Sequence, residues 1–311
     1  MPRLSVIMPL YKAEKYIVDT MDSILGQSYG DFELIVVDDC GGDNSLDIVE
    51  NYKDVRVRII YNNENKGISY SRNAGLLSAS GEYIALMDDD DISVKDRFKR
   101  EIEFLDAHDE VDAVCSDMRF IDASGKIIPK TAIETFMNPS RERAEMMFRL
   151  PVPNASTMFR SKIVKENNIQ YKDGWLGMED YRFWTDFTMY GDICSIGDVL
   201  YYWRFHDENE THRAQREQKK ERAELFAKLQ SENISNNGFS LSDNERAVFN
   251  RSFPEEKSPF VYSKQDIEET RRVLLQIINQ AQEKKMKDIA AVAFACKRHF
   301  GRLTEQSEIW K

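Results

Sequence analysis

Short apolar runs alternate with helix-like patterns through the first ninety residues of the chain. Four runs predict buried strands, at Leu4–Pro9, Phe32–Asp38, Val55–Tyr61 and Tyr83–Met87. The segments between them carry apolar residues at helical spacing and predict helices, at Ala13–Gln27, Leu46–Tyr52 and Ser69–Ala79. Ser45 is a suitable N-cap for the second helix. The alternation predicts a mostly parallel sheet covered on both faces, which binds ligands beyond the carboxyl ends of its strands.

The middle of the chain mixes the two patterns. It predicts helices at Phe98–Ala107, Arg141–Arg149 and Asp180–Tyr190. It predicts extended segments at Asp112–Phe120, Ala155–Phe159 and Val199–Phe205. Pro151 and Pro153 interrupt the second helical pattern.

The pattern becomes helical and highly charged near residue 212. Helices are predicted at Gln215–Leu229, Asp243–Asn250, Lys264–Lys285 and Lys287–Phe300. Apolar stripes on the last two, such as Leu274 and Ile278 or Val292 and Cys296, must be buried against another surface. We therefore expect an α/β domain over residues 1–212 and an all-helical domain over residues 213–311.

Charge and composition narrow the functional classes. A formal net charge of −11 over 311 residues disfavours nucleic acid as the main partner, because the chain repels a phosphate backbone. Four cysteines without a CxxC pair signal neither a zinc site nor a disulfide framework, which suits a reduced cytoplasmic setting. No apolar run approaches the length of roughly 20 residues that spans a membrane. We expect no transmembrane segment, and any membrane contact would be peripheral, at the inner face.

Four adjacent carboxylates, Asp88 to Asp91, directly follow the apolar run Tyr83–Met87. Such a cluster at a strand end suits a hard divalent cation, Mg²⁺ or Mn²⁺, which would also neutralise a diphosphate. A solvated acidic turn is the alternative.

Asp38 and Asp39 follow the second apolar run in the same way. A carboxylate there could accept the N3–H of uracil and would reject cytosine, which offers an acceptor at that position. The alternative is an acidic turn that caps the next helix, since Asp43, Asn44 and Ser45 follow closely.

The segment Asn65-Lys66-Gly67 leads into the helix that carries Arg72. Gly67 permits a sharp turn, the helix start offers free N–H groups, and Arg72 adds a planar cation, which together suit a phosphate. An ordinary loop with a surface arginine explains the same residues.

Two further candidates lie near the end of the α/β region. Asp180, preceded by Glu179 at the start of an aromatic-rich helix, is a candidate general base. The alternative is a pair of acids that complements the helix dipole. Period-two alternation puts Arg204 and His206 on one face of their strand, so His206 could ligate a metal or touch a phosphate, or be structural.

These motifs, in this order, resemble those of the family 2 inverting glycosyltransferases with the GT-A fold. The resemblance covers roughly residues 3–207 and is carried by Ser5–Tyr11, Val36–Asp39, Asn65–Gly67 with Ser71–Asn73, Leu86–Asp91 and Glu179-Asp180. It implies a Rossmann-like mixed sheet. Cys40-Gly41-Gly42 departs from the small residues that the family often has there.

The resemblance also implies the roles of individual residues. Pro9, Tyr11 and Asp39 would surround the base, with Gly67 and Arg72 near the diphosphate. Asp88 and Asp90 fall on the metal-binding DxD positions, and Asp180 falls on the position of the catalytic base.

The predicted activity is metal-dependent, inverting transfer of a hexose from a UDP-sugar to a hydroxyl of a glycan, glycoprotein or lipid-linked acceptor. The helical domain would then serve acceptor binding or homo-oligomerisation. A sugar nucleotidyltransferase is the enzymatic rival, although Leu10–Ala13 lacks the glycine-rich loop expected after the first strand. A non-catalytic nucleotide-binding or scaffold protein acting through the helical tail is the third alternative.

Overall fold

The computed structural model describes residues 1–129, 133–206, 218–255 and 262–305. The chain forms two compact units. The first comprises residues 1–137 and 152–214, and the second residues 138–151 and 215–311. The predicted boundary at residue 212 and the start of the helix predicted at Gln215 lie outside the described residues.

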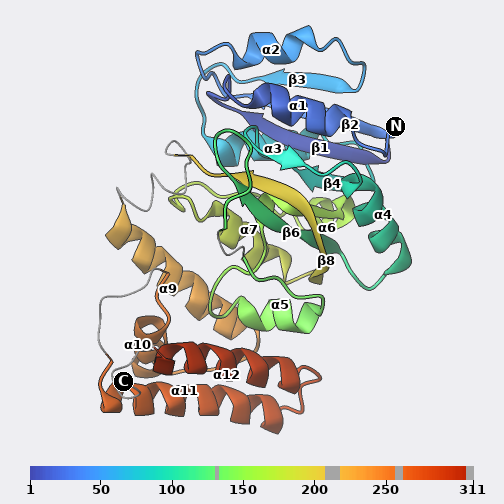
Figure 1. Cartoon of the computed structure of the whole chain (residues 1–311). Coiled ribbons are helices and arrows are strands. Elements are labelled where there is room, and N and C mark those ends of the chain that lie inside the picture. Colours follow the sequence, from blue (N-terminus) through green and yellow to red (C-terminus); the bar gives the residue numbers. More distant parts are fainter. Residues whose placement is uncertain (130–132, 207–217, 256–261, 306–311) are drawn as a thin grey trace. The chain divides into compact units, whose positions relative to one another are not determined.

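A mixed sheet of eight strands forms the centre of the first unit (Figure 1). Its order is β3-β2-β1-β4-β7-β6-β8-β5. The strands are β1 (Leu4–Leu10), β2 (Phe32–Asp38), β3 (Val57–Tyr61), β4 (Tyr83–Leu86), β5 (Ile92–Ser93), β6 (Ala113–Ile121), β7 (Thr157–Arg160) and β8 (Ile193–Arg204). The first four are parallel to one another, as the alternating pattern predicts, and β7 pairs antiparallel with β4 and β6.

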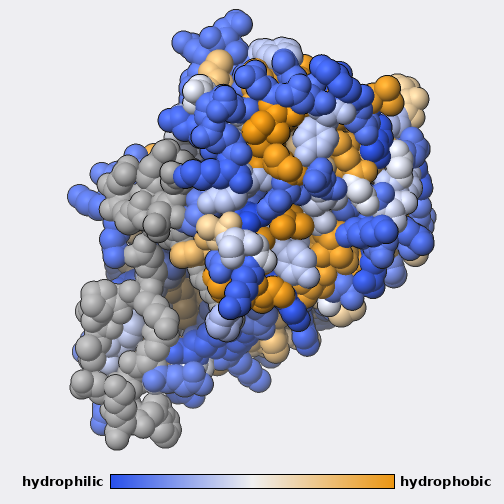
Figure 2. Space-filling model, turned by 45° about the horizontal axis from the view of Figure 1, so that its top comes forward, coloured by the Kyte–Doolittle hydropathy of each residue, from blue (hydrophilic) through white to orange (hydrophobic). Residues whose placement is uncertain are grey.

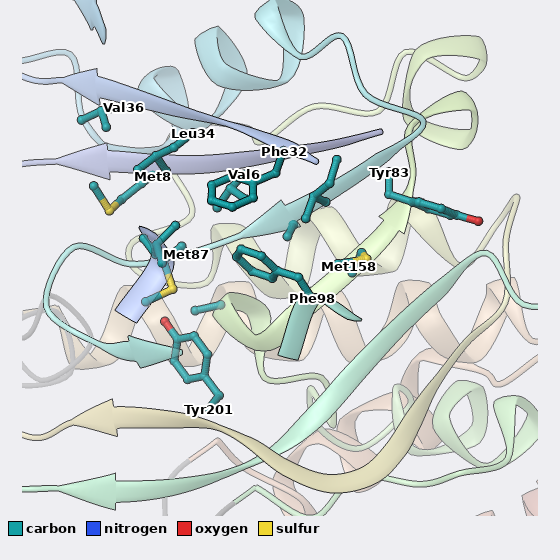
Figure 3. Packing of buried hydrophobic residues seen from close by; sticks show 14 of the residues in the cluster. Val6, Met8, Phe32, Leu34, Val36, Tyr83, Met87, Phe98, Met158 and Tyr201 are labelled. Atoms are coloured by element: carbon teal, nitrogen blue, oxygen red, sulfur yellow. The ribbon is translucent and has the colours of Figure 1, made fainter. Parts of the chain in front are cut away.

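Helices cover both faces of this sheet. The first unit contains α1 (Ile17–Leu25), α2 (Ser45–Asn51), α3 (Ile68–Ser78), α4 (Arg97–Ala107), η1 (Asn154–Ser156), α6 (Ser161–Glu166) and α7 (Glu179–Phe187). One face of β1 and β2, carrying Val6, Met8 and Val36, packs in a single core with residues of α1 and α4 (Figure 3). Phe98 of α4 lies beside these strand residues and forms an edge contact with Phe32, at 5.6 Å between ring centroids.

The opposite face of the sheet needs a small residue at the α3 contact. A Cβ atom on Gly75 would lie 2.4 Å from Cγ2 of Ile7 in β1, which is closer than non-bonded carbon atoms approach in proteins. The absent side chain lets α3 lie close against β1, which fixes the start of α3 near the strand ends.

Several local features differ from the sequence predictions. Strand β8 begins at Ile193, six residues before the predicted start, because Gly197 and Asp198 interrupt the apolar pattern and lie at a register shift, on both sides of which the strand pairs with β6. The two-residue strand β5 and the six-residue helix α6 are too short to produce a periodic signal. Ser45 is the first helical residue of α2 instead of its N-cap, and its hydroxyl contacts Asp43.

The second unit is all-helical. It contains α5 (Pro139–Glu145), α9 (Lys219–Asn236), α10 (Asp243–Ser252), α11 (Lys264–Glu283) and α12 (Ile289–Glu305). Ser242 and Ser263 form capping boxes at the starts of α10 and α11. Apolar residues of α10, α11 and α12 share one core, as the stripes predict.

Helix α5 is separated by more than sixty residues from the rest of this core, yet it is part of it. Phe148, just after α5, lies 5.0 Å from the rings of both Phe249 and Phe253. The buried carboxylate of Glu145 accepts hydrogen bonds from Arg298 at 2.6 Å and pairs with His299 at 2.9 Å. The sequence pattern alone grouped this helix with the preceding α/β residues.

The surface seen in Figure 2 carries hydrophobic side chains in several groups between hydrophilic ones. Among the residues that the structure describes, no helix combines the length and apolar character that crossing a membrane requires.

Candidate active site

The carboxyl ends of three adjacent parallel strands bring the predicted site residues together. In β1, Leu10 pairs with Asp38 of β2, and Ile7 pairs with Leu86 of β4. Tyr11, Asp39 and Asp88 each follow one of these strand ends. Pro9 is half-buried in β1, and Tyr11 is exposed. Three motifs that are far apart in the sequence thus meet at one edge of the sheet.

Asp39 holds the loop that leads into α3. Its Oδ1 accepts hydrogen bonds from the Lys66 amide at 2.8 Å and from Asn62 Nδ2 at 2.7 Å. Its Oδ2 accepts one from the Gly67 amide at 2.9 Å. Gly67 has a φ of +85°, which favours glycine. A carboxylate offers about four acceptor positions, so the protein groups fill three of them and leave one on Oδ2.

The four aspartates after β4 divide into two alternating pairs. Oδ2 of Asp89 accepts the Tyr11 amide at 2.8 Å, and Oδ1 of Asp91 accepts the Arg204 amide at 2.7 Å. Those two side chains thus connect the turn to the main chain at the end of β1 and at the end of β8. Asp88 and Asp90 instead pair with cationic or titratable side chains, Arg72 and His206.

Burial and mutual repulsion destabilise the charged forms of this cluster. Burial is the main cause that raises the pKa of Asp88, which Arg72 opposes and Asp90 reinforces. Burial followed by repulsion from Asp90 raises the pKa values of Asp89 and Asp91 well above their ordinary range. A cation at the turn would relieve both effects.

Arg72 connects the acidic turn to the start of α7. Its buried guanidinium donates to Oδ1 of Asp88 at 3.0 Å and lies 3.6 Å from Oε1 of Glu179. It lies over the ring of Tyr171, 5.2 Å from the centroid. These carboxylates keep the pKa of Arg72 above its usual value, although burial opposes them. Arg72 is therefore a permanent cation between Asp88 and α7.

Asp180 lies in the first turn of α7, where its Oδ1 accepts the Tyr181 amide at 2.7 Å. The helix is anchored below this residue by Trp184, whose indole donates to Oδ1 of Asn154 at 3.0 Å. Phe183 stacks on Tyr171, with centroids 4.3 Å apart. A carboxylate on a rigid, half-buried helix start suits proton transfer.

His206 lies against Asp90, with Nε2 2.8 Å from Oδ2. Arg204 is predicted on the same side of the strand as His206, but its sequence context indicates no role for it. In the structure Arg204 is fully buried, and its Nε donates to the Asp90 carbonyl at 2.7 Å. It could have been suspected from its period-two spacing to His206. Thr20, which donates to the Asp91 carbonyl at 2.8 Å, gave no sequence signal.

Within residues 1–129, 133–206, 218–255 and 262–305, no three His, Cys, Asp or Glu side chains converge as a ready metal cage. Mg²⁺ in nucleotide enzymes commonly takes one or two carboxylates together with substrate phosphates and waters. Two ligands of one octahedral ion at about 2.1 Å lie roughly 3 Å apart. The separation of 2.8 Å between Asp90 Oδ2 and His206 Nε2 fits such a pair.

Comparison with known proteins identifies relatives of this arrangement. The model of the family "Glycosyl transferase family 2" matches residues 5–166. A Haemophilus influenzae protein described as an uncharacterized glycosyltransferase is 30% identical over 75% of this chain and 74% of its own length. Poly(ribitol-phosphate) beta-N-acetylglucosaminyltransferase TarS of Staphylococcus aureus is 29% identical over 68% of this chain, but the match spans 37% of TarS.

The crystal structure of S. aureus TarS 1–349 in complex with UDP-GlcNAc has a similar fold. It matches with a TM-score of 0.60 at 20% identity, over 99% of this chain and 93% of that chain. The mixed sheet and a C-terminal helical region are thus features that the two structures have in common.

Proposed function

The chain belongs to glycosyl transferase family 2, and we propose that it transfers a hexose from a UDP-sugar to a hydroxyl of a glycan or glycoconjugate. The predicted GT-A fold with C-terminal helices and the predicted enzyme class are confirmed. The proposal rests on the contacts of Arg72. This residue pairs with Asp88 in the acidic turn and with Glu179 at the start of α7, the helix that carries the candidate base, Asp180. A donor diphosphate and an acceptor hydroxyl would meet across this residue.

The nucleotide would lie at the ends of β1 and β2. The remaining acceptor position on Asp39 Oδ2 suits the N3–H of uracil. Pro9 and Tyr11 would line the base, because Pro9 pairs with Val37 and the ends of β1 and β2 lie side by side. The crystal structure of the TarS fragment holds UDP-GlcNAc, which supports a uridine donor here. Gly67 and the start of α3 would face the phosphates.

Asp88, Asp90 and His206 would hold a divalent metal, Mn²⁺ or Mg²⁺. The donor set is suitable because carboxylate and imidazole ligands accept these ions, and because burial and the nearby Asp90 raise the pKa of Asp88, which a cation would oppose. When bound, the ion would neutralise charge on the departing diphosphate. Arg72 would add a second positive charge nearby.

Asp180 would act as the general base. The acceptor oxygen attacks the anomeric carbon while the bond from that carbon to the diphosphate oxygen breaks. The hydroxyl proton passes to the Asp180 carboxylate, and UDP leaves with the bonding electrons. One in-line displacement inverts the anomeric configuration. Glu179, paired with Arg72, would keep the start of α7 next to the donor.

A donor screen tests the proposed function. The purified chain is incubated with Mn²⁺ and UDP-glucose, UDP-galactose, UDP-GlcNAc or GDP-mannose, and released UDP or GDP is measured. We expect slow UDP release from one UDP-sugar and acceleration by a glycan acceptor. Release of GDP alone, or of pyrophosphate from a nucleoside triphosphate and sugar phosphate, would contradict the proposal.

The helical residues 213–311 would serve acceptor binding or self-association. Their buried apolar stripes are satisfied by one another and by α5, so they form a core of their own. Light scattering of the full chain tests self-association, and binding of an acceptor glycan to a donor-free sample tests the other role. If the full chain is a monomer and substitutions on α11 and α12 leave its acceptor affinity unchanged, these helices have neither role.

A further inference from the structure

The backbone of the acidic turn is held by neighbouring elements. Oγ1 of Thr20 in α1 donates to the carbonyls of Asp89 at 3.1 Å and Asp91 at 2.8 Å. Asp90 lies between them, and its carbonyl accepts a bond from a different element, β8. The direction of the Asp90 side chain therefore depends on the contacts of the turn with α1 and with β8.

Arg204, the last residue of β8, supplies that second restraint. Its amide donates to Asp91 Oδ1 and its Nε to the Asp90 carbonyl, each at 2.7 Å. Its Nη2 donates to Asp19 of α1 at 3.0 Å and its Nη1 to the Ala123 carbonyl at 3.3 Å. One planar guanidinium thus ties the turn to α1 and to the end of β6.

The same guanidinium also supports the Asp90 carboxylate indirectly. It lies over the ring of Tyr16, 4.8 Å from the centroid. Tyr16 stacks on the imidazole of His206, with centroids 4.9 Å apart. His206 in turn lies 2.8 Å from Asp90. Arg204 therefore restrains the backbone of Asp90 directly and its carboxylate through a Tyr16–His206 stack.

Burying a guanidinium costs several kcal/mol unless excellent geometry offsets the loss of water. Arg204 is fully buried, whereas the carboxylate of its acidic partner Asp19 is 59% exposed. A purely structural tie between β8 and α1 would not require a planar five-donor group at this position. The directed contact that distinguishes this arginine is the one to the Asp90 backbone.

We propose that Arg204 is a positioning residue that, with Tyr16, orients Asp90 for divalent metal. This inference rests on the proposed role of Asp90 as a metal ligand. Neither Arg204 nor Tyr16 touches the metal or the substrate. Groups that orient metal ligands typically change metal affinity by roughly 10–100-fold when they are altered.

Direct Mn²⁺ binding tests the proposal. The dissociation constant of Mn²⁺ is measured by electron paramagnetic resonance in the presence of UDP, for wild type, Arg204→Lys and Tyr16→Leu. Lysine keeps the charge and the backbone amide but cannot reach the three acceptors of the guanidinium in fork geometry. We expect roughly 10–100-fold weaker Mn²⁺ binding for Arg204→Lys and a smaller loss for Tyr16→Leu. At saturating Mn²⁺, kcat should stay close to that of wild type.

Arg100→Lys is the matched control, because Arg100 forms an exposed ion pair with Asp198 away from the turn. Its Mn²⁺ affinity should be unchanged. If Arg204→Lys fails to fold, Tyr16→Leu decides alone, since it leaves the charges and hydrogen bonds in place. Unchanged Mn²⁺ affinity in the folded variants, even with lower stability or kcat, would overturn the inference.

The variant Asp90→Ala distinguishes failure of the positioning role of Arg204 from failure of the proposed metal site. If it abolishes Mn²⁺ binding while Arg204→Lys and Tyr16→Leu bind normally, the positioning role fails and the proposed metal site stands. If Asp90→Ala binds Mn²⁺ as wild type does, the proposed metal ligand is wrong and the inference falls with it.

Discussion

Replacing Asp39 by asparagine changes a single atom at the proposed base site. In the wild-type protein, the Asp39 carboxylate accepts three protein hydrogen bonds, from Asn62, Lys66 and Gly67. The asparagine carbonyl would keep the Oδ1 position, where two donors converge. Its NH₂ group would then replace Oδ2 and face the Gly67 amide, so that two donors oppose each other.

The expected cost follows from these contacts. A hydrogen bond to a charged group contributes about 1.5–3 kcal/mol. The variant loses the bond from Gly67 and the position proposed for uracil N3–H. We expect the protein to lose about 2 kcal/mol of stability and UDP to bind about 30-fold more weakly, which corresponds to the same free energy. Because the NH₂ group can donate to cytosine N3, the preference for UDP over CDP should also fall.

Calorimetric titration with UDP and CDP measures both affinities, and denaturant unfolding measures the stability. Asp38→Asn is the matched control, since Asp38 is the adjacent aspartate and is similarly buried. Burial raises the pKa of the Asp38 carboxyl, so a neutral amide should be tolerated there. Asp38→Asn should bind UDP like wild type.

The reasoning is refuted if Asp39→Asn retains both the affinity for UDP and the discrimination against CDP. Loss of stability without any change in nucleotide preference would restrict Asp39 to holding the loop at Lys66 and Gly67. Equal loss of UDP affinity in Asp38→Asn would show that general disturbance of the loop, and not the Asp39 carboxylate, controls binding.

Four further outcomes are expected. Asp180→Asn should bind UDP normally but transfer about 10²–10⁴-fold more slowly; near-normal transfer kinetics would refute its role as base. Asp90→Ala should reduce turnover by orders of magnitude with the fold intact by circular dichroism, and full activity of this variant with a chelator present would exclude the metal role. Arg97→Met leaves the buried Glu101 carboxylate without its cation at 3.0 Å and should cost about 3–5 kcal/mol in denaturant unfolding, whereas Arg97→Met/Glu101→Leu should recover most of it. Because burial raises the pKa of Glu101 from 4.5 to about 7, wild type should lose stability as pH rises through that interval; a double variant with the same pH dependence would contradict this assignment.

The N-terminal strands could be predicted because local pattern and buried position agree there. Strand β2 has the predicted bounds, Phe32–Asp38, since both of its faces are covered and the apolar run is continuous. The start of strand β8 could not be predicted, since Gly197 weakens the pattern and the strand pairs with β6 on both sides of a register shift at this glycine. Helix α5 has an apolar side that fits many partners, and the partners that it and the following Phe148 contact, such as Phe249 and Arg298, lie one hundred or more residues later.

The candidate site was predictable at the level of which segments meet, because carboxyl ends of parallel strands share an edge. The sequence did not predict that the four aspartates of the acidic turn have different kinds of partner. Asp89 and Asp91 hold main-chain amides of Tyr11 and Arg204, which only the folded chain brings near. The same limit applies to Asp39, whose hydrogen bonds to Lys66 and Gly67 depend on how the loop returns.

The placement of α5 in the second unit has a consequence for the order in which the protein is made. When the ribosome has synthesised residues 1–214, the buried side chains of Met147 and Phe148 still lack α9 to α12. They lack this packing until α9 to α12 have been synthesised, so the core of the second unit cannot be completed earlier. The C-terminal helices are also not an exchangeable cassette: a gene fusion that swaps residues 215–311 must replace residues 138–151 as well, because both segments build one core.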